Sequence, residues 1–226
     1  MRHIIVLFLS LFITVVGNAQ NEKITQQLDK FTEVKGFDGL SINLIKSKEN
    51  KAVITGANTK KVAIVNNGGV LKIRMELDKL FSGYRTFIDL YYTETLVVID
   101  VNEDAKIVSK ETLKQEVLEL KSQEGGELQV AAEVEQMLIK STTGGVITAK
   151  GNAKVQDVNI NTGGIYNGEK LKTEFSTISV NAGSNAKIYA TNYVKATVKA
   201  GGEVLVYGDP LKMDEKTVFG GTVKRM

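Results

Sequence analysis

Side chains that could carry acid–base chemistry occur in the chain, but no spacing separates a pair from the rest. Asp157, Glu174 and Lys195 lie among short strand-like segments. Carboxylates or lysines presented on one face are the groups with which polysaccharide-cleaving enzymes work. Lysine and glutamate also alternate along the other segments, as on any solvated surface. The three residues therefore leave a polysaccharide-active enzyme open as an alternative without indicating a catalytic pair.

Composition excludes two further kinds of chemistry. The 226 residues include no cysteine and one histidine, His3, which lies in the expected signal peptide. The mature chain would then have no Cys nucleophile, no Ser–His–Asp triad and almost no zinc ligand set. The acidic run at 100–104 (DVNED) could offer oxygens to Ca²⁺, but it lacks the order of an EF-hand loop, and a solvated turn is the better interpretation. We expect no catalytic residue, no metal and no cofactor.

One aromatic cluster could contact a partner. It lies in and beside residues 76–85 (ELDKLFSGYR), which interrupt an otherwise regular series of strands. Loops on rigid scaffolds often carry binding, and exposed Tyr and Arg side chains are common anchors. We expect Phe87 and Tyr91 to face the core, and Tyr84 and Arg85 to form the contact loop.

The elements that would position these residues are indicated by a repeated glycine pair. A fixed period near 19 residues predicts a solenoid, in which glycine supplies the positive φ of each sharp corner. An earlier pair ends at Gly69, 57 residues before the next, which equals three further steps of 19. The second residues of the later pairs, at steps of 19, 19, 20, 18 and 19, are Gly126, Gly145, Gly164, Ser184, Gly202 and Gly221.

Alternating apolar and polar residues predict two short strands in each period between residues 115 and 226. A single coil of this kind cannot bury its apolar side, whereas stacked coils share a continuous core. Parallel strands joined by crossovers prefer the right-handed sense. The predicted fold is all-β, a right-handed parallel β-helix or solenoid with coils of about 19 residues.

The first residues predict export. Residues 1–19 read as a signal peptide, with small residues at Gly17 and Ala19, and the apolar run at 4–16 is too short to span a bilayer. The mature protein is expected in the periplasm, on the outer surface or outside the cell, with no transmembrane segment. Residues 20–36 form an N-terminal cap segment, for which a short amphipathic helix and an irregular cap are equally plausible, and residues 37–226 form the solenoid domain.

Charge gives little indication of a polyelectrolyte partner. Without Arg2 the chain keeps 28 basic and 26 acidic residues, so its net charge is about +2. Because these charges alternate and do not cluster, they do not predict a nucleic-acid surface.

Several segments together resemble a known family, the head GIN domain proteins, also called auto-transporter adhesins, which are exported proteins of Bacteroidetes-type origin. They are residues 37–45 (FDGLSINLI), 71–74 (LKIR), 206–210 (VYGDP) and 218–224 (VFGGTVK), and the likeness covers about residues 35–226. The family's usual S-G-S-G turns are written here as STTGG, NTGG and NAGS. The resemblance implies a β-solenoid with an adhesion role and brings no catalytic residues.

We therefore expect a non-enzymatic, exported adhesin or scaffold. Its ligand would be a surface polymer, a glycan or a protein. The oligomeric state stays open, and end-to-end stacking of coils depends on whether the two ends are covered.

Overall fold

The computed structural model describes residues 23–226. Nearly all of this chain is β-strand, with three single-turn 3₁₀ helices, η1 (Thr59–Lys61), η2 (Leu77–Lys79) and η3 (Gly83–Arg85). The strands are β1 (Ile24–Gln27), β2 (Glu33–Gly36), β3 (Ser41–Lys46), β4 (Lys51–Gly56), β5 (Val62–Asn67), β6 (Val70–Met75), β7 (Thr86–Tyr92), β8 (Val98–Val101), β9 (Lys106–Ser122), β10 (Glu127–Ser141), β11 (Val146–Ile160), β12 (Ile165–Lys172), β13 (Phe175–Asn181), β14 (Asn185–Tyr189), β15 (Tyr193–Lys199), β16 (Glu203–Tyr207), β17 (Lys212–Val218) and β18 (Thr222–Arg225).

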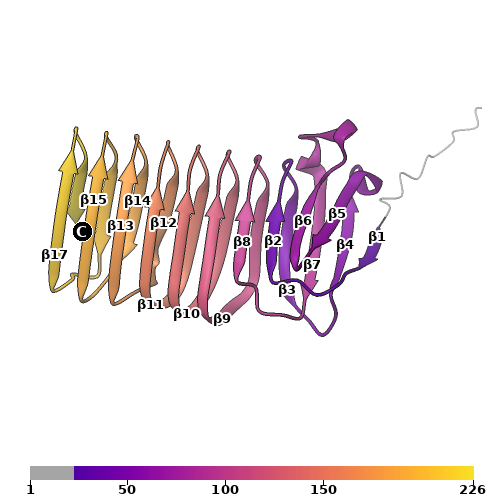
Figure 1. Ribbon diagram of the computed structural model, residues 1–226, viewed down its shortest axis with the longest axis horizontal. Coiled ribbons are helices and arrows are strands. Elements are labelled where there is room, and N and C mark those ends of the chain that lie inside the picture. Colours follow the sequence, from indigo (N-terminus) through magenta and orange to yellow (C-terminus); the bar gives the residue numbers. More distant parts are fainter. Residues whose placement is uncertain (1–22) are drawn as a thin grey trace, which may run out of the picture.

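The strands form two parallel layers that are joined along one side by tight turns (Figure 1). One layer contains β6, β2, β8, the second halves of β9, β10 and β11, then β13, β15 and β17. The other contains β7, β3, the first halves of β9, β10 and β11, then β12, β14, β16 and β18. The chain climbs the near layer and descends the far one as it advances, so the coil is right-handed. The predicted β-solenoid is confirmed.

Strand pairing reproduces the period that the glycine pairs predict. Residues that follow successive turns are direct neighbours, in the order Glu127, Val146, Ile165, Asn185, Glu203 and Thr222. Their steps are 19, 19, 20, 18 and 19. One detail differs from the prediction, because β10 and β11 each continue through the bend opposite the turns as one long strand. Pairing of β10 with β11 persists almost without interruption through the bend, so two short strands merge.

The positive φ of each corner lies one residue earlier than we predict. In the turn between β10 and β11, Thr143 and Gly144 have φ of 48° and 72°, and the Gly145 N–H donates to the Thr142 carbonyl at 2.9 Å. Two successive left-handed residues closed by this bond are the type I′ arrangement. The first glycine of the pair therefore supplies the conformational freedom.

The second glycine of each pair meets a different demand. Gly126, Gly145, Gly164 and Gly221 do not have positive φ, and among the predicted corner residues of the ladder only Gly202 does. A Cβ on Gly145 would lie 2.5 Å from the backbone oxygen of Ser122 in the preceding coil. Real Cβ atoms do not approach so closely, so this position is glycine because the coils touch there. Our prediction of the residue type was right, but its physical reason was wrong for these four.

The period does not extend back to Gly69. Gly68 and Gly69 form the two-residue loop of an antiparallel hairpin between β5 and β6, with φ of 60° and 88°. The segment that we expect to be a helix or irregular cap contains β1, which pairs antiparallel with β4 at the outer edge. It also contains β2, which lies inside the stack between β6 and β8. The coil made by β2 and β3 therefore lies between two coils that come later in the sequence. The expected signal peptide at 1–19 falls outside the described residues.

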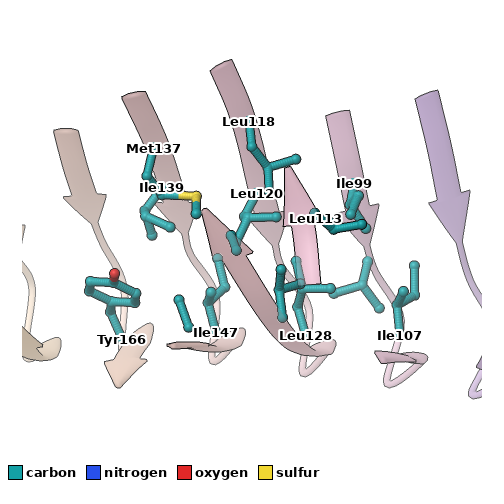
Figure 2. Packing of buried hydrophobic residues seen from close by; sticks show 14 of the residues in the cluster. Ile99, Ile107, Leu113, Leu118, Leu120, Leu128, Met137, Ile139, Ile147 and Tyr166 are labelled. Atoms are coloured by element: carbon teal, nitrogen blue, oxygen red, sulfur yellow. The ribbon is translucent and has the colours of Figure 1, made fainter. Parts of the chain in front are cut away.

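The core is a continuous column of Ile, Leu, Val, Ala and Met between the two layers. In Figure 2, Leu118 and Met137 of one layer point toward Leu128 and Ile147 of the other. All four side chains are buried. Each coil adds a similar set, which is why the stack is stable although a single coil would not be.

The last coil places polar side chains at inward positions. Glu215 pairs in register with the buried Ala196, and Arg225 pairs with the buried Val206. Both side chains are exposed because no coil follows, and Arg225 binds Asp209 at 2.8 Å. Charges at inward edge positions oppose the addition of another strand. The C-terminal end is therefore protected against end-to-end stacking.

Candidate functional site

The Glu76–Arg85 segment takes the place of a tight turn in one coil. Elsewhere a two-residue turn joins the two layers, but β6 and β7 are connected by a longer loop that contains η2 and η3. Figure 1 shows this loop protruding beyond the row of turns at the N-terminal end of the stack. The prediction that residues 76–85 interrupt the repeat is confirmed.

Asp38 fixes the loop to the neighbouring turn. Its side chain is fully buried, its φ is 60°, and its carboxylate accepts hydrogen bonds from the backbone N–H groups of Met75 at 2.9 Å and Phe81 at 3.3 Å. Its own carbonyl accepts from the Gly83 N–H at 2.9 Å. A buried carboxylate that accepts backbone donors makes strong, directional bonds. The loop is thus held at both ends and is not a free excursion.

The loop exposes large apolar side chains to solvent. Tyr84 is 56% exposed and Phe81 is 58% exposed. Leu77, Leu80 and the neighbouring Phe87 are exposed as well. We call these five side chains the apolar loop patch. Clusters of exposed apolar residues on soluble proteins often lie at interaction sites.

Tyr84 is ordered although it is exposed. Its hydroxyl donates to the Asp104 carboxylate at 2.9 Å, and its ring lies against Gly39, where a Cβ would be 3.0 Å away. The hydrogen bond to a negative acceptor, followed by partial desolvation, raises the pKa of Tyr84. The ring is therefore presented in a fixed orientation.

Arg85 is exposed at the end of the loop, and none of the described residues forms an ion pair or a hydrogen bond with its guanidinium. Its backbone carbonyl accepts from the Ala57 N–H at 2.8 Å, which ties the loop to the end of β4. The structure thus brings Tyr84 and Arg85 together in an exposed and anchored loop. Whether they bind a ligand remains a prediction.

The expectation that Phe87 and Tyr91 face the core is wrong. Ile88 and Leu90 occupy the inward positions of β7, so Phe87 is exposed and Tyr91 is half-buried on the outer face, where Lys51 lies 5.2 Å from its ring centre. Tyr92 faces inward instead, and burial, with a smaller contribution from Glu111, raises its pKa to about 12. Alternation in the strand was clear, but the aromatic residues gave a misleading phase.

A carboxyl pair lies beneath the loop. Burial of Glu103 and the negative charge of Asp38 raise the pKa of Glu103, against the opposing effect of Arg74. One Glu103 carboxyl oxygen is buried without a hydrogen-bond partner. The predicted acidic run at 100–104 is therefore a tight turn, as expected, but it is not fully solvated, since Asp100 is buried and binds Lys35 at 3.3 Å.

The residues of the enzyme alternative do not meet. Asp157 and Lys195 lie in the same layer with the intervening coil's Thr177 between them. Glu174 lies at the bend, where it accepts a hydrogen bond from Asn192. Within residues 23–226 there is also no group of three or more acidic, histidine or cysteine side chains able to hold a metal ion. The geometry brings together no acid–base pair from this set.

Sequence reasoning missed Asp38 and the apolar side chains of the loop. Asp38–Gly39 is written like the other turns, but its role depends on a loop that folds over it from 40 residues later. Leu77 and Phe81 resemble core residues in composition, and only the loop's protrusion shows that they are exposed.

These features define a parallel β-solenoid that displays an anchored apolar loop at one end. The chain belongs to the family described as "Putative auto-transporter adhesin, head GIN domain", whose model matches residues 30–210. The resemblance inferred from the sequence is thereby confirmed. Comparison with curated proteins gave no match.

Solved structures share the fold. A "putative adhesin" from Bacteroides fragilis superposes with a TM-score of 0.84 at 15% identity, covering 92% of this chain and 98% of its own. A "putative adhesin" from Parabacteroides distasonis gives 0.72 at 19% identity, covering 93% and 98%. A "putative lipid binding protein" from the same species gives 0.69 at 14% identity, covering 93% and 98%. Among the described residues, no helix has the length and hydrophobicity needed to cross a bilayer.

Proposed function

We propose that the protein is a non-enzymatic, exported adhesin that attaches to a surface ligand through the apolar loop patch and Arg85. Membership in an adhesin family supports the general role. The observation that carries the assignment to this loop is the exposure of Leu77, Phe81 and Tyr84 on a segment anchored by a buried carboxylate. Exposing apolar side chains on an ordered loop is costly in water and is offset when a ligand covers them.

The loop suits binding because its geometry is fixed before a ligand arrives. Ordering a flexible segment on binding reduces affinity, whereas a preorganised segment avoids that cost. Tyr84 presents a ring held by Asp104, and Arg85 presents a guanidinium that can bind carboxylates or stack on aromatic and sugar rings. The ligand class that fits is a surface polymer, glycan or protein that offers an apolar face beside an acceptor group.

Export is part of the proposal. The apolar run and the Gly17-x-Ala19 ending support it, as does the absence of cysteine from a chain that would fold outside the reducing cytoplasm. Intact-mass analysis of exported protein is expected to show a chain that begins at Gln20. A mass that retains Arg2 would contradict this boundary.

Attachment tests the role of the loop directly. The Tyr84→Ala/Arg85→Ala variant is expected to bind immobilised cell-surface polymers at least about tenfold more weakly, as for loss of an interface anchor. Phe175→Ala is the matched control, because Phe175 is an exposed aromatic residue on the flat layer. Equal attachment by the loop variant and the native protein would refute the assignment to this loop.

A turnover assay on the same polymers separates the adhesin from the enzyme alternative. We expect no hydrolysis or elimination product. Polysaccharide cleavage that is lost in Asp157→Asn or Glu174→Gln would establish the enzyme instead.

A further inference from the structure

A groove of about 660 Å³ runs along the bends, on the side of the solenoid opposite the tight turns. One small residue from each of five successive coils lines its floor: Gln115, Val134, Ala153, Thr173 and Thr191. Val134, Ala153 and Thr173 are almost fully buried. The groove therefore follows the solenoid axis over several coils, and an extended ligand fits it better than a compact one.

The shape of the groove follows from unequal coils. The coil through β12 and β13 is 20 residues from its predecessor, whereas the next, through β14 and β15, follows after only 18. Because the tight turns stay aligned along the stack, the difference in length is absorbed at the bends. The surface there is consequently uneven, although the two layers remain regular.

The two walls alternate in charge. One wall carries Glu133 and Lys172 on either side of Asn152, and the other carries Lys154 between Glu135 and Glu174. The lining thus has three carboxylates and two ammonium groups. A polyanion would meet repulsion from the carboxylates and a polycation from the lysines, whereas hydroxyl groups can donate to the former and accept from the latter. The lining favours an uncharged, hydroxyl-rich chain.

The floor cannot pair with a peptide strand. Its backbone groups are already bonded between coils, for example from the Glu174 N–H to the Lys154 carbonyl and from the Thr191 N–H to the Thr173 carbonyl, both at 3.1 Å. A peptide added as a strand needs free backbone donors and acceptors. Recognition in the groove must therefore come from side chains.

A buried polar network supports the floor. Gln156 donates to the Thr173 hydroxyl at 3.2 Å and to the Tyr189 carbonyl at 3.1 Å, and it accepts from the Tyr166 hydroxyl at 3.0 Å. Tyr166, which rises from one layer toward the other in Figure 2, carries this network across an otherwise apolar core. Polar groups in a core are costly unless fully bonded, and a bonded network makes its surroundings rigid. The floor at Thr173 is thereby fixed in position.

We propose that this groove binds a linear, uncharged polysaccharide along the solenoid axis, through the side chains of Asn152, Lys154 and Glu174. The site is separate from the apolar loop patch, which lies at the N-terminal end on the side of the turns. Each carboxylate, amide and ammonium group on the walls can bond a sugar hydroxyl, and the small floor residues admit the sugar rings.

Titration of the full mature chain with linear glucan, mannan and xylan hexasaccharides tests the proposal, with NMR chemical shifts as the readout. At least one is expected to bind, with shifts confined to the groove residues. Asn152→Ala and Lys154→Ala should each weaken binding by about tenfold, as for loss of a hydrogen bond to a bound ligand. The matched controls Asn167→Ala and Lys187→Ala, which alter the outer face of β12 and β14, should change it less than twofold.

Three results would overturn the proposal: no binding of any of the three glycans at millimolar concentration, equal binding by the groove and control variants, or tighter binding of a polygalacturonate hexasaccharide than of the neutral ones. The Tyr84→Ala/Arg85→Ala variant should keep its affinity for the hexasaccharide. Failure of the loop proposal and failure of the groove proposal are thus distinguishable.

Discussion

The regular stack from β9 onward and the N-terminal end from β1 to β8 solve the same burial problem by different means. In the stack each coil repeats the previous one, so burial, pairing and turn geometry follow from one 19-residue pattern. At the N-terminal end, antiparallel strands and a reordered coil cover the open edge. The repeat supplies stability, whereas departures from it close the end of the stack and provide the loop that we propose as a contact. The following predictions test this contrast, in order of decreasing effect.

The largest effect is expected where coils touch in the stack. Gly145→Ala should lower the free energy of unfolding by about 3 kcal/mol, because its Cβ would meet the Ser122 carbonyl of the coil below and force the backbone to move. Denaturant unfolding measures the change. The control, Gly144→Ala, has open space around its Cβ and should cost only the left-handed penalty of about 1–2 kcal/mol. Equal losses would mean that contact between coils does not determine the glycine ladder.

The next effect concerns the polar crossing of the core. Tyr166→Phe removes the donor to Gln156 and should cost about 1–3 kcal/mol, since a buried amide oxygen loses its partner. Thermal unfolding gives the comparison. Tyr207→Phe, on the outer face of β16, is the control and should stay within about 0.5 kcal/mol. A neutral result for Tyr166 would show that the network contributes nothing to rigidity.

A smaller and local effect is expected at the N-terminal hairpin. Gly69→Ala places a side chain at φ 88° with no close contact, so it should cost about 1 kcal/mol. Hydrogen exchange should show faster opening of β5 and β6, while protection in β10 and β11 stays unchanged. Loss of protection throughout the stack would indicate that the two regions unfold as one unit.

The smallest effect is the pH dependence of the loop anchor. The pKa of Glu103 is raised in the folded state above its ordinary value of 4.5, so its favourable contribution is complete below that value and is lost as pH rises through the folded pKa. Glu103→Gln should therefore stabilise the protein at pH 7 by a few tenths of a kcal/mol, because the side chain is largely solvated, and the gain should vanish near pH 4. Melting temperatures at the two pH values test the sign. A gain that grows on acidification would contradict it.

Much of the regular stack could be predicted from the sequence, because its period is written directly in the glycine pairs. The steps from Gly126 to Gly221 equal the pairing steps in the structure. The reason for the glycines was harder to infer, since Gly144 and Gly145 look equivalent in the sequence and differ only in what surrounds them. A single chain shows conformational demand and contact demand as the same letter.

The N-terminal end and the candidate site could be predicted only in part. Residues 76–85 are recognisable as a break in the repeat, and Tyr84 and Arg85 are exposed there. The reordering of β2 and β3 leaves no local signal, because their residues alternate like those of any other strand. The roles of Asp38 and of the groove depend on neighbours far away in the sequence. Inward or outward facing of Phe87 likewise depends on which neighbour of β7 supplies the core.

The position of β2 also determines how the molecule bears a mechanical load. Its four residues pair at the same time with β6 on one side and β8 on the other, and both neighbours are parallel to it. A force on the chain before β2 first separates β1 from β4, and then acts along two ladders whose bonds must shear together. A force on the C-terminus meets only β18 and β17, which can detach one strand after the other. A tether at the N-terminal side would accordingly be the stronger of the two attachments.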